Sequence, residues 1–205
     1  MRMTLKSLFA HFKEMPNYFI ASALVFIAGV ALGYADSARF EAILQSQVEG
    51  LRQLAQSIAV KDHSMLWLFG FIFLNNALKS ILIIFAGALF GVLPLFFLLI
   101  NGMVIGYLAS LQAQAGELGF FLKGILPHGV LEIPAIVIAC AYGIKLGAIV
   151  GKGFLRLPSS QGRQAFAAEW SRFMKVSVPL IGLLVVTLLA AAIVESTVTP
   201  WLIRK

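Results

Sequence analysis

The sequence predicts an all-α fold, a polytopic integral membrane helix bundle with about five spans. Hydrophobic residues make up 60% of the 205 residues and charged residues only 12%, which is half the share of an average soluble domain. Several apolar runs exceed the roughly 18 residues that a membrane-spanning helix needs. Polar residues and two prolines recur inside these runs. These three observations predict a bundle in a lipid bilayer that encloses a polar core.

The net charge of +7 is explained by membrane orientation rather than by nucleic-acid binding. Basic residues of membrane proteins gather in the cytoplasmic loops. Residues 1–17 carry three basic residues and residues 151–175 carry five, whereas residues 36–62 carry three that are offset by four acids. Five spans put the two basic segments on one side. We therefore predict a multi-pass protein of the plasma (inner) membrane with a cytoplasmic N-terminus.

The first 62 residues predict an interfacial helix, a span and a surface helix. Apolar residues recur at helical spacing before Pro16, so residues 1–17 should form a short amphipathic helix on the membrane. They are too polar for a cleavable signal peptide. The first span is expected at 18–34. Residues 36–62 repeat apolar positions every three or four residues, which predicts an extracytoplasmic amphipathic helix. A partner-binding role for that helix is the alternative.

The second predicted span, residues 66–90, is interrupted by Asn75, Asn76 and Lys79. Two interpretations of the asparagines are open, a polar lining or interhelical hydrogen bonds worth about 1 kcal/mol each. Lys79 lies too far from either end of the span to reach water easily, which favours the lining.

The third predicted span, residues 95–111, has Asn101 near its middle. Glycines four residues apart recur in the second, third and fourth spans. Such pairs let helix backbones approach closely, so we interpret them as packing devices. The single cysteine, Cys140, excludes an internal disulfide bond and a cysteine-based metal cluster.

The fourth predicted span is residues 127–150, within the stretch 119–150. The most unusual residues of this stretch are His128 and Glu132. They are four residues apart and share one helix face. Pro127 and Pro134 predict helix breaks, because proline lacks an N–H and disfavours helix at the residue before it. In one interpretation Pro127 starts an ordinary span. In the other, residues 119–125 form a re-entrant half-helix.

The last part of the chain predicts a cytoplasmic basic segment, residues 151–175, that rests in the interface. A fifth span is expected at 176–194, with Glu195 at its end. A charge at bilayer depth costs roughly 3 kcal/mol, so buried ionisable groups are functional candidates. We expect Glu132 to pair with His128 or with Lys79 inside the bundle.

Several of these residues also resemble a known family. The residues that carry the resemblance are Asn75-Asn76, Gly87, Asn101-Gly102, Gly106, Leu126-Pro127-His128-Gly129, Glu132, Ala135, Glu195 and Thr199-Pro200. In this order they resemble the stage II sporulation protein M family, from about Trp67 to Pro200, and the Pro-His-Gly-x-x-Glu element is the most specific part. The resemblance implies a polytopic membrane protein with a polar core. In endospore formers the family member works with cell-wall hydrolases during engulfment, but homologues also occur in organisms that make no spores.

Three functions follow from these residues. The first is transport or ion and proton coupling of an unknown substrate through Asn75, Asn76, Lys79, Asn101, His128, Glu132 and Glu195. The second is a membrane scaffold of a cell-envelope remodelling complex. The third is an intramembrane metal site at His128 and Glu132, which lacks the second histidine of zinc proteases. Enzymatic activity and a cofactor are not expected. The partners considered are an ion or small solute, envelope proteins and a second copy of the chain.

Overall fold

The computed structural model describes residues 5–59 and 64–203, and within these residues every regular element is a helix. Five of the helices are long and apolar enough to cross a membrane. They are α2 (Pro16–Ala35), α4 (Ser64–Ala86), α5 (Val92–Gln114), α6 (Leu118–Arg156) and α7 (Ser160–Ile193). This confirms the predicted all-α membrane bundle with five spans.

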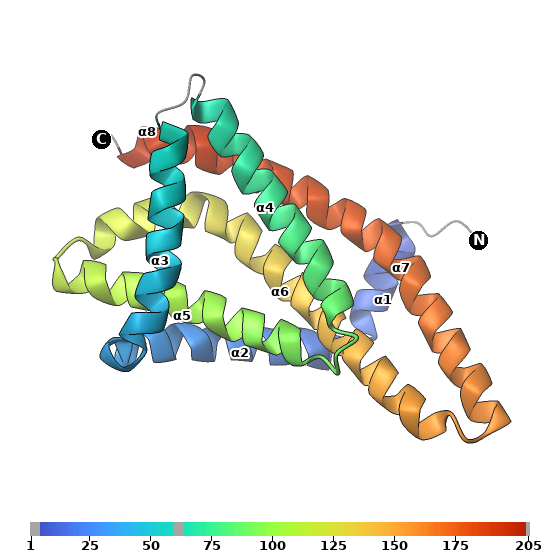
Figure 1. Cartoon of the computed structure of the whole chain (residues 1–205). Coiled ribbons are helices and arrows are strands. Elements are labelled where there is room, and N and C mark those ends of the chain that lie inside the picture. Colours follow the sequence, from blue (N-terminus) through green and yellow to red (C-terminus); the bar gives the residue numbers. More distant parts are fainter. Residues whose placement is uncertain (1–4, 60–63, 204–205) are drawn as a thin grey trace.

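The remaining helices lie at the two ends of the bundle (Figure 1). The N-terminal α1 (Leu5–Lys13) and the α6–α7 hairpin lie on one side. On the opposite side are α3 (Ser37–Ala59) and α8 (Thr199–Ile203), which ends the described chain. The described part of the first basic segment, 5–17, and the basic segment 151–175 therefore lie on the same side of the bundle, as five alternating spans require.

The closest helix pair in the bundle is α2 with α5, which pack along most of their length. Gly29 and Gly33 of α2 face Gly102 and Gly106 of α5, and backbone atoms of the opposite helix lie where a side chain would begin at each position. Without a hydrophobic driving force between helices in lipid, such backbone proximity supplies the packing energy. The same device joins the end of α4 and the turn that follows it to α6, where Gly87 and Gly91 approach Gly143 and Gly147. The interpretation of the glycine pairs as packing devices is thus confirmed.

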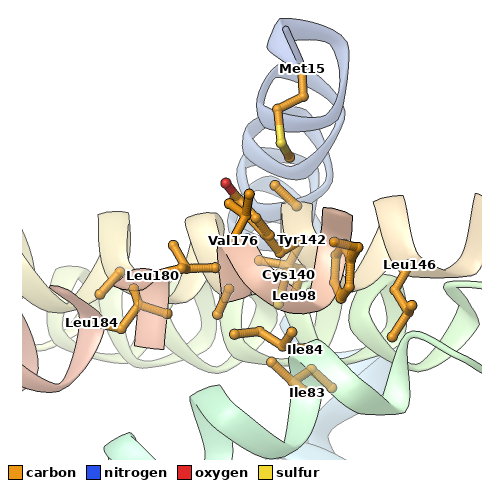
Figure 2. Close-up of a cluster of buried hydrophobic side chains, with 14 of the residues drawn as sticks. Met15, Ile83, Ile84, Leu98, Cys140, Tyr142, Leu146, Val176, Leu180 and Leu184 are labelled. Carbon is orange, nitrogen blue, oxygen red and sulfur yellow. The ribbon is translucent and has the colours of Figure 1, made fainter. Parts of the chain in front are cut away.

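The apolar core lies where α4, α5, α6 and α7 meet (Figure 2). Small residues of α6, including Ala139 and Cys140, let the neighbouring helices approach, and Leu180 and Leu184 of α7 fill the space beside them. Leu44 of α3 packs separately against Met103 and Tyr107 of α5, which fixes the amphipathic α3 across the end of the bundle.

The predicted helix break near Leu126 is wrong. Helix α6 runs without interruption for 39 residues, with Pro127 and Pro134 inside it, so residues 119–125 form no separate half-helix. The helix bends in its first half instead (Figure 1). Each proline removes only one backbone hydrogen bond, and neighbouring helices support the bent backbone of a membrane helix well enough to keep it continuous.

The basic segment 151–175 does not form an element of its own. Its first part ends α6 and its second part begins α7, with a turn at 157–159 in which Ser159 Oγ accepts a hydrogen bond from Gly162 N at 2.9 Å. At 1.5 Å per residue α6 is roughly 58 Å long, well beyond the roughly 30 Å hydrocarbon core. Helix α6 is therefore longer than one crossing of the hydrocarbon core requires.

The topology gives a first testable prediction. Cysteines introduced as Gln56→Cys in α3 and Ser160→Cys in α7, both at exposed positions, should react with a membrane-impermeant maleimide from opposite sides of the membrane in a Cys140→Ala background. In intact cells the maleimide should label Gln56→Cys only. In permeabilised cells it should label both variants. Labelling of both cysteines in intact cells would contradict the five-span arrangement.

Candidate functional site

A cavity of about 400 Å³ lies inside the bundle between α2, α4, α5, α6 and the π-helical segment η1 (Val194–Val198). Most of its wall is apolar. The polar residues that line it are Asn75, Asn76, Asn101, His128, Glu132 and Glu195. Six of the seven residues that the sequence predicted for the polar core therefore line one space.

Three ionisable groups converge at this cavity. One ligand atom each from His128, Glu132 and Glu195 lies within 4.8 Å of the other two. His128 and Glu132 are one turn apart on α6, whereas Glu195 comes from η1 at the end of α7. A π-helical turn inserts an extra residue into a helix and is often found at functional sites. Here it begins one residue before Glu195.

The asparagines of α4 hold one of the carboxylates. Asn76 Nδ2 donates a hydrogen bond to Glu132 Oε1 at 2.9 Å, and Asn75 Nδ2 donates to Asn76 Oδ1 at 3.3 Å. Glu132 is therefore hydrogen-bonded by a neutral amide, and neither His128 nor Lys79 makes the hydrogen bond to it that we expected. His128 Nδ1 is buried and has no hydrogen-bond partner among the described residues.

Two other predicted residues lie differently from the expectation. Lys79 is exposed, does not line the cavity and makes no hydrogen bond or ion pair with the described residues, although it lies near enough for its charge to act on Glu132. The predicted Lys79–Glu132 pair is thus wrong, because Asn76 rather than Lys79 faces α6. Asn101 lines the cavity, but its Nδ2 donates to the carbonyl of Phe97 on its own helix at 2.7 Å.

The donor atoms at the cavity suit a small cation. One imidazole nitrogen and two carboxylates form a ligand set that suits Zn²⁺, Mn²⁺ or Fe²⁺, and three protein ligands leave room for an exchangeable one. The unpartnered Nδ1 of His128 is available for such a bond. Without a metal, the same three groups can hold and pass a proton, since imidazole and carboxylate exchange protons readily.

The sequence analysis missed a second polar cluster, on the side of the bundle where α1 lies. His11 of α1 is 3% exposed, and its Nδ1 lies 2.9 Å from the hydroxyl of Tyr142. Its Nε2 lies 2.9 Å from Lys145 Nζ. Because an ammonium group can only donate, Nε2 is the acceptor and Nδ1 carries the proton. A signal was present, since His11 lies three residues after the apolar Leu8 and therefore on the same face of α1.

This cluster predicts a stability that depends on pH. Burial, and then the charges of Lys145 and Arg172, lower the pKa of His11 from 6.5 to about 4, while Glu14 opposes the shift. Between these values the unfolded chain binds a proton that the folded protein excludes, so the free energy of unfolding falls as the pH is lowered from about 6.5 to about 4. The loss should be on the order of 2–3 kcal/mol.

Thermal unfolding in detergent between pH 7 and pH 4.5 measures this effect. The matched variant His11→Gln keeps polar atoms but has no proton to bind, so its melting temperature should fall less over the same interval. Equal pH dependence in the wild type and His11→Gln would contradict the assignment.

Comparison with known proteins places the chain among membrane proteins. The family model described as Stage II sporulation protein M matches residues 22–200. A protein of Methanocaldococcus jannaschii described as uncharacterized is 33% identical over 129 residues, which cover 62% of this chain and 68% of that protein. A second protein from the same organism, also described as uncharacterized, is 26% identical over 110 residues, 53% of this chain and 47% of that protein. No solved structure matches.

Proposed function

This chain belongs to the stage II sporulation protein M family of membrane proteins, and we propose that it moves or couples to a small cation, in the simplest case a proton, through the cavity at His128, Glu132 and Glu195. One observation carries the proposal, namely that these three groups converge from two helices on one space of about 400 Å³. Intramembrane ionisable groups are costly, so a protein that needs only packing does better without them.

The depth of the cluster supports this role. His128 lies ten residues after the first residue of α6, roughly 15 Å along the helix axis, which is about half the hydrocarbon thickness. Substrate and ion sites of transporters lie at this depth. The amides of Asn75 and Asn76 add hydrogen-bonding capacity without adding charge, so Glu132 is oriented but not neutralised by a fixed cation.

Proton flux into liposomes tests the proposal. Purified protein is reconstituted with the pH dye pyranine inside, and a potassium gradient with valinomycin sets the membrane potential. The wild type should acidify the lumen faster than empty liposomes. Glu132→Gln keeps the shape and removes the charge, so it should reduce this rate at least tenfold. The matched control Glu117→Gln changes an exposed carboxylate in the loop before α6 and should leave the rate unchanged.

A metal ion is the second candidate occupant, and Glu195 is the observation that favours it, because it adds a third ligand to the two that the sequence predicted. Protein purified without chelators should then retain close to one Zn²⁺, Mn²⁺ or Fe²⁺ per chain by elemental mass spectrometry. His128→Leu should lose the metal, and Glu117→Gln should keep it. If the protein retains a metal but shows no proton flux, the occupant of the cavity is a metal ion and not a proton. If the protein shows no proton flux and retains no metal, a scaffold role in an envelope complex is favoured instead.

A further inference from the structure

A second cavity, of about 280 Å³, opens between α1, α6 and α7, on the side of the bundle away from α3. It does not belong to the site at Glu132. Its charged lining residues are Glu14, Lys145, Lys152, Glu169 and Arg172, and the other titratable ones are His11 and Tyr18. Three different elements thus bring three cations and two carboxylates to one space.

Both carboxylates of this cavity are already engaged. Arg172 Nη2 binds Glu14, with 2.6 Å to the nearer carboxylate oxygen, and Arg156 Nη1 binds Glu169 at 2.8 Å. Lys145 and Lys152 have no carboxylate partner among the described residues. The ammonium group of Lys145 is half-buried and contacts only neutral acceptors, His11 Nε2 at 2.9 Å and Met15 Sδ at 3.7 Å. The cavity therefore holds two positive charges that are not balanced.

The neutral state of His11 agrees with this charge distribution. Burial is the main cause of the low pKa of His11, about 4, and the positive charges of Lys145 and Arg172 lower it further, which agrees with a positive potential in the cavity. At neutral pH the imidazole accepts from Lys145 and holds its ammonium group toward the cavity. An anion that enters would meet donors that are already oriented, which lowers the cost of binding.

The position of the cavity indicates which anion it meets. Helices α6 and α7 continue past the cavity into the projecting hairpin, and α1, which contributes His11 to the cavity, exposes the apolar Phe9, as an interfacial helix does. The cavity thus lies at the level of the lipid headgroups. Basic pockets between membrane helices at this level bind phosphate-bearing headgroups, and lysine binds phosphate as a point charge.

We propose that Lys145 and Lys152, supported by Arg172, form a binding site for an anionic phosphate group. The group is supplied by a phospholipid of the bilayer or by a free phosphate compound. The site is independent of the cation-coupling role proposed above, because the two cavities share no lining residue.

Native mass spectrometry of the full-length protein tests the lipid source. Protein is released from nanodiscs that contain equal amounts of phosphatidylglycerol and phosphatidylcholine. We expect the wild type to retain phosphatidylglycerol at least fivefold over phosphatidylcholine. Lys145→Met combined with Lys152→Met should abolish this preference, whereas Lys145→Arg with Lys152→Arg should keep it. Lys175→Met, an exposed lysine on α7 outside the cavity, is the control for general surface charge and should also keep it.

Binding of a free phosphate compound is tested on delipidated protein in a neutral detergent. Inorganic phosphate at 10 mM should raise the melting temperature of the wild type above that in chloride of equal ionic strength, if a soluble phosphate is the ligand. The single variant Lys152→Met changes only an exposed side chain, so it should fold even if the double variant does not. It should lose at least half of the lipid preference or of the rise in melting temperature with phosphate. A wild type with no lipid preference and no response to phosphate overturns the proposal. So does a preference that Lys152→Met retains in full.

Discussion

Gly106→Ala is expected to lower the stability of the bundle by about 3 kcal/mol, the upper end of the range for overpacking a well-packed contact. The new methyl group would lie closer than 3.0 Å to backbone atoms of Val30 and Tyr34 on α2. Backbone atoms cannot move aside as a flexible side chain can, so α2 and α5 must separate along the whole contact. Thermal unfolding in detergent micelles, with scanning fluorimetry as the readout, measures the change.

Gly182→Ala is the matched control. Gly182 lies in the middle of α7, is exposed, and has no atom within 4 Å of the position that a Cβ would take. Because alanine is the better helix former, this variant should melt at the wild-type temperature or slightly above it. If Gly106→Ala has the same melting temperature as Gly182→Ala, the α2–α5 contact is looser than the structure indicates.

Glu195→Gln is expected to stabilise the metal-free protein while it impairs cation coupling. The ligand atoms of Glu132 and Glu195 lie within 4.8 Å of each other. Two carboxylates at this distance repel by about 3 kcal/mol at an effective dielectric constant of about 20. The amide removes that repulsion and keeps the shape of the side chain. The melting temperature at pH 8, in the presence of a chelator, should therefore rise by several degrees.

The opposite sign would have a clear meaning. If Glu195→Gln lowers the melting temperature, this carboxylate holds η1 in place and the cluster is structural. Glu117→Gln again serves as the control, since it removes a negative charge far from the cavity and should leave the melting temperature unchanged. A gain in stability together with a loss of proton flux is the pattern of a site kept for function at the expense of stability.

The fold was predictable because membrane insertion is decided by short, local properties of the chain. A run of about 20 apolar residues is sufficient to predict a span, and the structure has five such helices. The effect of Pro127 was not predictable in the same way. Whether proline breaks a helix or only bends it depends on the helices packed around it, and these come from distant parts of the chain.

The candidate site was predictable only where its residues are close in sequence. Helical spacing alone placed His128 beside Glu132. The choice between Asn76 and Lys79 as the residue that faces Glu132 depends on the rotation of α4 about its axis, which interhelical packing sets. The approach of Glu195 depends on the α6–α7 packing and on a π-helical turn, and no local pattern encodes either of these.

The glycine contact between α2 and α5 has a consequence for biogenesis. Gly33 leaves the ribosome 73 residues before Gly106, the residue that completes its partner surface. At roughly 5–20 residues per second, translation takes about 4–15 seconds to cover that distance. During this time the first span is in the membrane while its glycine face touches lipid or the insertion machinery. Assembly of this bundle thus starts from its third span, and a ribosome that stalls before residue 106 leaves the first span without its partner.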